Sequence, residues 1–160
     1  MTTTVEETVQ SQTKGSLTQL FSFRVGSQKY ALDILRVQEI RRWEPCTLLP
    51  HAPPEVRGVI NLRGAIVPVI DLRLKFGGCE AEYLPTTVIV IVRVQHAGKE
   101  KVVGMVVDAV LDVFTVNQDN MSECPDVGTA GALDFVEGMI KQQDDMLIVI
   151  SVDEMLQNSI

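Results

Sequence analysis

Apolar and polar residues alternate along most of the chain beyond residue 20, which is the pattern of half-buried β-strands. The first alternating segment, LFSFRV, begins at Leu20, and the second, QKYALDI, follows Gly26 and Ser27. Because a short turn with a glycine joins the two segments, we expect a β-hairpin. Its inward-facing residues would be Phe21, Phe23, Val25, Tyr30, Leu32 and Ile34.

A proline-rich loop and a second pair of strands follow this hairpin. RVQEIRR continues the alternation, but four prolines within residues 44–56 predict a rigid, irregular loop without a helix. VINL and AIVPVI are predicted strands on either side of Arg63 and Gly64. Pro68 cannot donate a backbone hydrogen bond, so we expect the second of these strands to run along a sheet edge or to carry a bulge.

Two short helices are expected, each directly after a strand. Asp71 is a predicted N-cap for the first, and the glycine pair at 77–78 would close it. Ser151 and Glu154 have the spacing of a capping box for a C-terminal helix at about 152–158.

The second half of the chain repeats the theme of short, β-branched strands. TTVIVIVRV, KVVGMVVDAV, DVFTV, EGMIK and MLIVIS are predicted strands, with hairpin turns at HAGKE and QQDD. Residues 79–85 form a polar connector, and residues 117–134 form a long excursion rich in glycine and aspartate. Strands at this spacing indicate barrels or a sandwich, here two barrel-like halves of about five strands each.

The expected fold is therefore mainly β, with two five-stranded SH3-like or OB-like barrel subdomains that share a core. One short helix follows the first barrel and another ends the chain. We expect residues 1–16 to be a disordered tail, because they offer little to bury, and residues 17–160 to form one domain. The subdomains would span about 20–78 and 86–150.

Composition indicates a globular protein with an uneven charge distribution. Hydrophobic residues make up 46% of the 160 residues and aromatic residues 5%, as in an aliphatic core. The formal net charge is −7, yet residues 36–75 carry a net charge of +3. This basic stretch suggests a surface for an acidic partner, although ordinary solvated arginines explain it equally well. With no signal peptide and no long apolar run, we expect a cytosolic protein that does not enter a membrane.

No catalytic, metal or cofactor site is expected. His51 and His96 are the only histidines, and His51 with Cys46 offers two potential ligands, too few for a closed zinc site. The chain has no GxSxG elbow for a nucleophile and no GxGxxG or GK[ST] for a phosphate. The three cysteines are widely spaced and form no CxxC pair.

Acidic pairs and aromatic residues offer equally little chemistry. The pairs Asp108 with Asp112 and Asp144 with Asp145 lie beside turns, where carboxylates are usually solvated. One tryptophan and two tyrosines are too few to stack bases, and a net charge of −7 opposes phosphate, so nucleic-acid binding is not expected.

The string GVINLRGAIVPVIDLR at residues 58–73 is unusual because it sets Arg63 and Gly64 between two apolar runs. Together with LFSFRVGSQKYALDILRVQEIRR and VVGMVVDAVLDVFTV, it resembles the CheW family of bacterial chemotaxis coupling proteins. The resemblance runs from about Leu20 to Leu156 and thus covers nearly all of the expected fold.

This resemblance implies two intertwined five-stranded barrel subdomains. It also implies an adaptor that catalyses no reaction, needs no cofactor and is monomeric in isolation. Its partners would be the cytoplasmic tip of a transmembrane chemoreceptor, a helical hairpin held in a groove between the subdomains, and the CheW-like regulatory domain of the histidine kinase CheA. The protein would be cytoplasmic and recruited to membrane-associated receptor arrays. The receptor-binding residues that the resemblance implies are Val37, Glu39, Ile40, Gly58, Arg63, Gly64, Val88, Gly104 and Val113.

A hypothesis for Arg63 is that it pairs with Glu39 on a neighbouring strand and shapes the edge of the groove. The simpler alternative is a solvent-facing arginine in a hairpin turn. For the protein as a whole, the alternatives are a small barrel that binds a ligand or nucleic acid, and an adaptor of a non-flagellar chemosensory pathway.

Overall fold

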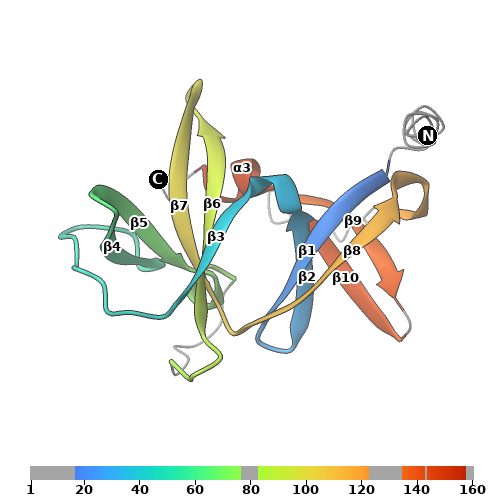
Figure 1. Cartoon of the computed structure of the whole chain (residues 1–160), viewed down its shortest axis with the longest axis horizontal. Coiled ribbons are helices and arrows are strands. Elements are labelled where there is room, and N and C mark those ends of the chain that lie inside the picture. Colours follow the sequence, from blue (N-terminus) through green and yellow to red (C-terminus); the bar gives the residue numbers. More distant parts are fainter. Residues whose placement is uncertain (1–16, 77–82, 123–134, 143, 158–160) are drawn as a thin grey trace, which may run out of the picture.

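The computed structural model describes residues 17–76, 83–122, 135–142 and 144–157. The expected tail at 1–16, the glycine pair at 77–78 and most of the excursion at 117–134 lie outside these ranges. Within them the chain forms two five-stranded sheets, which lie side by side in Figure 1. The mainly β fold with two five-stranded units is confirmed.

The first sheet has the strand order β8-β1-β2-β10-β9, and the second has the order β3-β6-β7-β5-β4. The strands of the first sheet are β1 (Leu17–Val25), β2 (Gln28–Asp33), β8 (Ala109–Asn117), β9 (Val136–Gln142) and β10 (Asp145–Ile150). Those of the second are β3 (Val37–Arg42), β4 (Val56–Leu62), β5 (Ala65–Asp71), β6 (Val88–His96) and β7 (Lys99–Val107). The helical segments are η1 (Ile34–Arg36), α2 (Leu72–Lys75), η2 (Gln118–Asn120) and α3 (Val152–Met155).

Each sheet combines strands from both halves of the chain. The β1–β2 hairpin joins β8, β9 and β10, and the β6–β7 hairpin joins β3, β4 and β5. The expected subdomains at 20–78 and 86–150 therefore do not correspond to the sheets. Each hairpin is joined to its sheet by one antiparallel pair, β1–β8 or β3–β6, and by one parallel pair, β2–β10 or β5–β7. Parallel pairing joins segments far apart in sequence, so the local alternation that predicts a hairpin does not reveal which sheet the hairpin enters.

The apolar core has three parts, in agreement with two units that share a core. One cluster, which includes Ile60 and Ile89, is formed by strands of the second sheet. Another, which includes Leu20 and Leu147, is formed by strands of the first sheet. The largest cluster contains residues of both sheets. Strand β6 shows why: Ile89 belongs to the core of the second sheet, whereas its neighbour Val90 belongs to the shared cluster, so both faces of the strand are buried.

The helix caps agree with the sequence. The Asp71 carboxylate accepts a hydrogen bond from the Arg73 backbone N–H at the start of α2. The Ser151 hydroxyl accepts one from the Glu154 N–H at the start of α3. None of the helices formed by the described residues has the length and apolar character needed to cross a membrane.

Pro68 was expected to lie on an edge strand or at a bulge, and it has an edge-like environment at its own position only. Strand β5 lies between β4 and β7, so it is not an edge strand of the sheet. Its pairing with β7 begins at Val69, however, and Pro68 therefore has only β4 beside it. The irregularity in register falls in β4, between Val56 and Gly58. A proline without an N–H is tolerated here because no ladder bond to β7 is required.

In both sheets an isolated β-bridge connects the segment after one edge strand to the opposite edge strand. After the edge strand β3, Thr47 pairs with Val59 of the opposite edge strand through backbone N···O distances of 2.9 and 2.8 Å. After the edge strand β8, Ser122 pairs with Met139 in the first sheet, at 2.8 Å in both directions. Each bridge gives backbone partners to an edge that would otherwise stay open.

The exchange of hairpins predicts that neither half of the chain folds alone. A fragment of residues 17–84 lacks β6 and β7, and a fragment of residues 85–157 lacks β1 and β2, which are central strands in the two sheets. We expect each fragment to give the circular dichroism spectrum of an unfolded chain and an equimolar mixture to recover β structure. A cooperative thermal transition in either isolated fragment would contradict this prediction.

Candidate functional site

The predicted receptor-binding residues divide into an exposed group and an interior group. Val37, Glu39 and Ile40 lie on the edge strand β3, and Arg63 and Gly64 form the turn between β4 and β5. Together these five residues are called the β3 surface. Its apolar part is accessible at Ile40, which is 45% exposed, whereas Val37 is partly buried against the shared core.

The turn explains why an arginine and a glycine interrupt two apolar runs. Leu62 pairs with Ala65, so only Arg63 and Gly64 connect the strands. Both have positive φ, +50° and +91°, as the tight turns of twisted hairpins require. The Gly64 N–H donates to Oδ1 of Asn61 at 2.8 Å. The turn therefore projects the Arg63 side chain from the end of the hairpin, where it is 65% exposed.

Arg63 and Glu39 form the expected ion pair, with Nη2 bound to Oε1 and Nη1 at 3.4 Å from Oε2. The hypothesis placed the two residues on neighbouring strands, and this part of it is wrong. Strands β3 and β4 are the opposite edges of the second sheet, and the ion pair connects these two edges. Arg41 adds a second, longer contact, 3.5 Å from Nη1 to Oε2 of Glu39. Glu39 is thus held between two arginines.

These arginines, Arg63 above all, lower the pKa of Glu39 below its ordinary value. The carboxylate therefore stays ionised to more acidic pH than an isolated glutamate. Because the pKa is lowered in the folded state, the contribution of the pair is present above the ordinary carboxyl pKa and is lost as the pH falls through the lowered value.

Gly58 and Gly104 are packing glycines rather than exposed contacts. Gly58 has φ +137°, and a Cβ there would lie 2.1 Å from the Thr47 carbonyl oxygen. At Gly104 a Cβ would lie 2.8 Å from Cγ2 of Ile89. Both residues are buried, so side chains added here would disturb the bridge after β3 and the core of the second sheet. Their part in receptor binding stays a prediction.

The two remaining predicted residues lie on different sheets. Val88 begins β6, faces Arg42 of β3 and is partly buried against the shared core. Val113 lies on β8 of the first sheet and is 51% exposed. The predicted receptor-binding residues thus belong to both sheets, and their part in binding stays a prediction.

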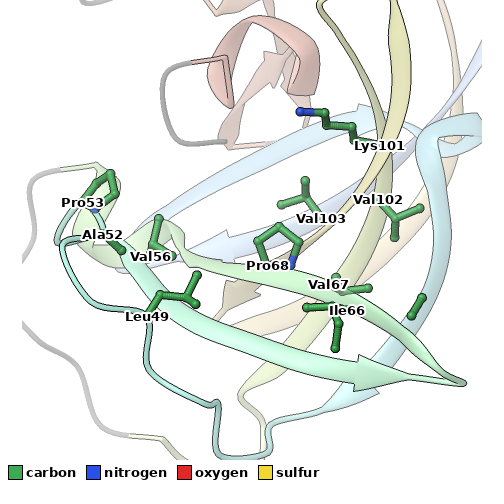
Figure 2. A pocket seen from close by; sticks show the side chains of 11 residues that line it. Leu49, Ala52, Pro53, Val56, Ile66, Val67, Pro68, Lys101, Val102 and Val103 are labelled. Atoms are coloured by element: carbon green, nitrogen blue, oxygen red, sulfur yellow. The ribbon is translucent and has the colours of Figure 1, made fainter.

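An apolar pocket that was not predicted from the sequence lies on the second sheet, with a volume of about 510 Å³. Figure 2 shows its lining, drawn from the proline-rich loop and from β5 and β7. Ile66 is 68% exposed and Leu49 is 45% exposed. The lining residues are Leu49, Ala52, Pro53, Val56, Ala65, Ile66, Val67, Pro68, Lys101, Val102 and Val103.

A weak signal for this pocket is present in the sequence. Alternation in AIVPVI turns Ile66 away from Val67, and Val67 is buried in the core of the second sheet. The outward residues of a two-layer sheet are normally polar, so an isoleucine there marks exposed apolar surface. The neighbouring proline obscured this pattern.

The described residues hold little reactive chemistry. Among them no group of three or more His, Cys, Asp or Glu is arranged to hold a metal ion. Burial raises the pKa of the Cys46 thiol to about 11, so it stays protonated and weakly nucleophilic near neutral pH. The expectation of a solvated Asp108 is wrong, because Asp108 is only 17% exposed and contacts the guanidinium of Arg73.

Comparisons with known proteins agree on one family. The model of a family described as the CheW-like domain matches residues 19–159. A chemotaxis protein CheW of Rhizobium meliloti is 38% identical over 135 residues, 84% of each chain. A CheW of Klebsiella aerogenes is 35% identical over 85% of this chain and 80% of the relative. The crystal structure of the scaffolding protein TtCheW from Thermoanaerobacter tengcongensis superposes with a TM-score of 0.76 at 33% identity, covering 88% of each chain.

The packing role of Gly58 predicts a large loss of stability for Gly58→Ala. The new Cβ would collide with the Thr47 carbonyl, and the positive φ adds strain, together costing about 3 kcal/mol. We expect the thermal midpoint to fall by roughly 6–12 °C in a melting experiment. The control is Gly98→Ala, which has φ +78° but open space around it, and should lose only about 1 kcal/mol. Equal effects of the two substitutions would contradict the collision.

Proposed function

Because the chain belongs to the CheW family of chemotaxis scaffold proteins, we propose that it is an adaptor that couples chemoreceptors to the histidine kinase CheA. It binds the cytoplasmic tip of a receptor and the regulatory domain of the kinase, and it catalyses no reaction itself. It acts in the cytoplasm at membrane-associated receptor arrays. The family assignment favours this function over a barrel that binds a small ligand or nucleic acid.

The observation that carries this proposal is the presence of two different exposed surfaces on the second sheet. The β3 surface combines apolar residues with the Glu39–Arg63 ion pair. The apolar pocket lies over β5, β7 and the loop before β4, and no residue of β3 lines it. An adaptor must hold two partners at once, so it needs two surfaces that do not overlap.

The β3 surface suits a helical hairpin. Ile40 offers exposed apolar contact to the apolar stripe of an amphipathic helix, and the accessible part of Val37 adds to it. Glu39 with Arg63 offers both signs of charge at the same edge strand. On the first sheet, Val113 supplies exposed apolar contact for the same partner. Micromolar affinity, about −8 kcal/mol, is enough for each contact, because multivalency in an array adds to it.

The apolar pocket is the proposed docking surface for the kinase regulatory domain. Its rim carries Lys101, and its exposed residue Ile66 can enter a complementary pocket in the way of an interface anchor. Docking of one CheW-like domain on another is what the resemblance implies. An adaptor of a flagellar pathway and one of another chemosensory pathway would use the same two surfaces.

Replacement of Arg63 by alanine separates recognition from stability. Because the Arg63 side chain is mostly exposed, we expect the thermal midpoint of Arg63→Ala to stay close to that of the wild type. We expect its affinity for receptor-containing membranes, measured by co-sedimentation, to fall about tenfold. Arg42→Ala removes an exposed arginine at the end of β3 and should retain binding. Unchanged affinity of Arg63→Ala rejects the recognition role and leaves a solvent-facing turn arginine.

Replacement of Ile66 by aspartate tests the kinase surface. A charge at the mouth of the apolar pocket should weaken binding to the purified kinase regulatory domain by at least about tenfold, measured by calorimetry. Receptor binding should be unchanged, because Ile66 lies outside the β3 surface. Met146→Asp is the matched control, since Met146 is a 44% exposed apolar residue of the first sheet. If Met146→Asp loses kinase binding and Ile66→Asp keeps it, the pocket is not the docking surface.

A further inference from the structure

A buried ion pair lies at the end of β5, directly before and within α2. Arg73 is 4% exposed and Asp71 is 2% exposed. The guanidinium binds the carboxylate through two parallel hydrogen bonds, Nε to Oδ1 and Nη2 to Oδ2, each 2.9 Å long. The same carboxylate caps the helix. The arginine is therefore held in one orientation, and its third nitrogen, Nη1, points to a second acid.

This second acid, Asp108, lies where the chain leaves the second sheet and enters the first. It stands between the last residue of β7 and the first residue of β8. Its Oδ1 accepts a hydrogen bond from Nη1 of Arg73 at 3.2 Å. Its Oδ2 accepts one from the backbone N–H of Gly26 at 2.7 Å. Its own N–H donates to the Arg24 carbonyl at 3.0 Å.

Gly26 belongs to the turn between β1 and β2, which are central strands of the first sheet. Arg73 belongs to α2, which extends β5 of the second sheet. One carboxylate thus joins the two sheets through charge-assisted and directional hydrogen bonds. The shared apolar cluster also holds the sheets together, but apolar contact is not directional and allows packed surfaces to slide or turn.

The linked groups continue to Trp43, the residue that follows strand β3. The Tyr83 hydroxyl lies 3.4 Å from Oδ2 of Asp71, and the guanidinium of Arg73 lies 4.9 Å from the centre of the Tyr83 ring. Trp43, which follows β3 directly, stacks on Tyr83 with ring centres 3.9 Å apart and planes within 4°. A connected set of side chains therefore runs from β3 to the turn of the first sheet.

We propose that Asp108 is a positioning residue: the Arg73–Asp108–Gly26 link fixes the orientation of the two sheets for a receptor that contacts both. The proposal rests on the proposed function, because the receptor-binding residues lie on β3 in one sheet and at Val113 in the other. Kinase docking does not need the link, since the apolar pocket is formed by the second sheet and its loop alone.

The test compares Asp108→Asn with wild-type protein. Asparagine keeps the shape of the side chain, but its amide nitrogen cannot accept a hydrogen bond. Because its one oxygen is drawn to the charged guanidinium of Arg73, the Gly26 N–H loses its acceptor. We expect the amide of Gly26 to exchange with solvent at least about tenfold faster by NMR. Affinity for receptor-containing membranes should fall about tenfold, whereas affinity for the kinase regulatory domain should stay within about twofold. Asp119→Asn removes the same charge at an exposed site and should change none of these quantities.

Each alternative result overturns the proposal in a different way. Faster exchange at Gly26 with unchanged receptor affinity shows that the link exists but does not position the receptor surface. An equal fall in both affinities shows general destabilisation. If the wild-type protein does not bind receptor-containing membranes, the proposed function is rejected. The rate of amide hydrogen exchange at Gly26 still decides in that case whether the link orders the turn.

A comparison within the wild type covers the case in which Asp108→Asn does not fold. Gly26 and Ala97 are the first residues of two hairpin turns, and both have positive φ. The structure gives the Ala97 N–H no side-chain acceptor among the described residues. Slower amide exchange at Gly26 than at Ala97 supports the link, and equal exchange overturns it.

Discussion

The reciprocal exchange of two hairpins is the constraint on which this structure depends. The β1–β2 hairpin from the first half of the chain forms the centre of a sheet with strands of the second half, and the β6–β7 hairpin does the reverse. Neither sheet is therefore complete without both halves of the chain. The side chains that face outward from one sheet then face the other, and the largest apolar cluster forms between them. A small protein gains in this way a core shared between two units, beside a smaller core within each unit.

The proposed receptor surface follows from the way the second sheet is finished. Its edge strands β3 and β4 are connected by the Thr47–Val59 bridge and by the Glu39–Arg63 pair. The bridge needs a residue without a side chain at Gly58, and the pair needs a tight turn at Gly64. The predicted receptor-binding residues are thus of two kinds. Some, such as Glu39 and Arg63, have side chains that a partner can contact, and others, such as Gly58 and Gly64, allow the backbone conformation that places those side chains.

Much of the local structure could be predicted from the residues alone. Period-two alternation identified the strands, turn residues placed the hairpins at Gly26-Ser27 and at HAGKE, and capping residues placed both helices. These features depend on contacts between residues close in sequence. The candidate residues on β3 and in the turn came from a family resemblance, and the structure adds to them the apolar pocket, which depends on a loop, a hairpin and β7 meeting in space.

The sequence by itself determined the β class, the hairpins, the caps and the membership of a family. Only the tertiary structure decided which strands share a sheet and that β3 and β4 lie at opposite edges. It also decided that Asp108 forms an ion pair with Arg73 between the sheets and is not a solvated turn residue. The reason is physical. Alternation and turn preference arise from neighbouring residues, whereas parallel pairing and buried charge depend on segments that the chain brings together from a distance.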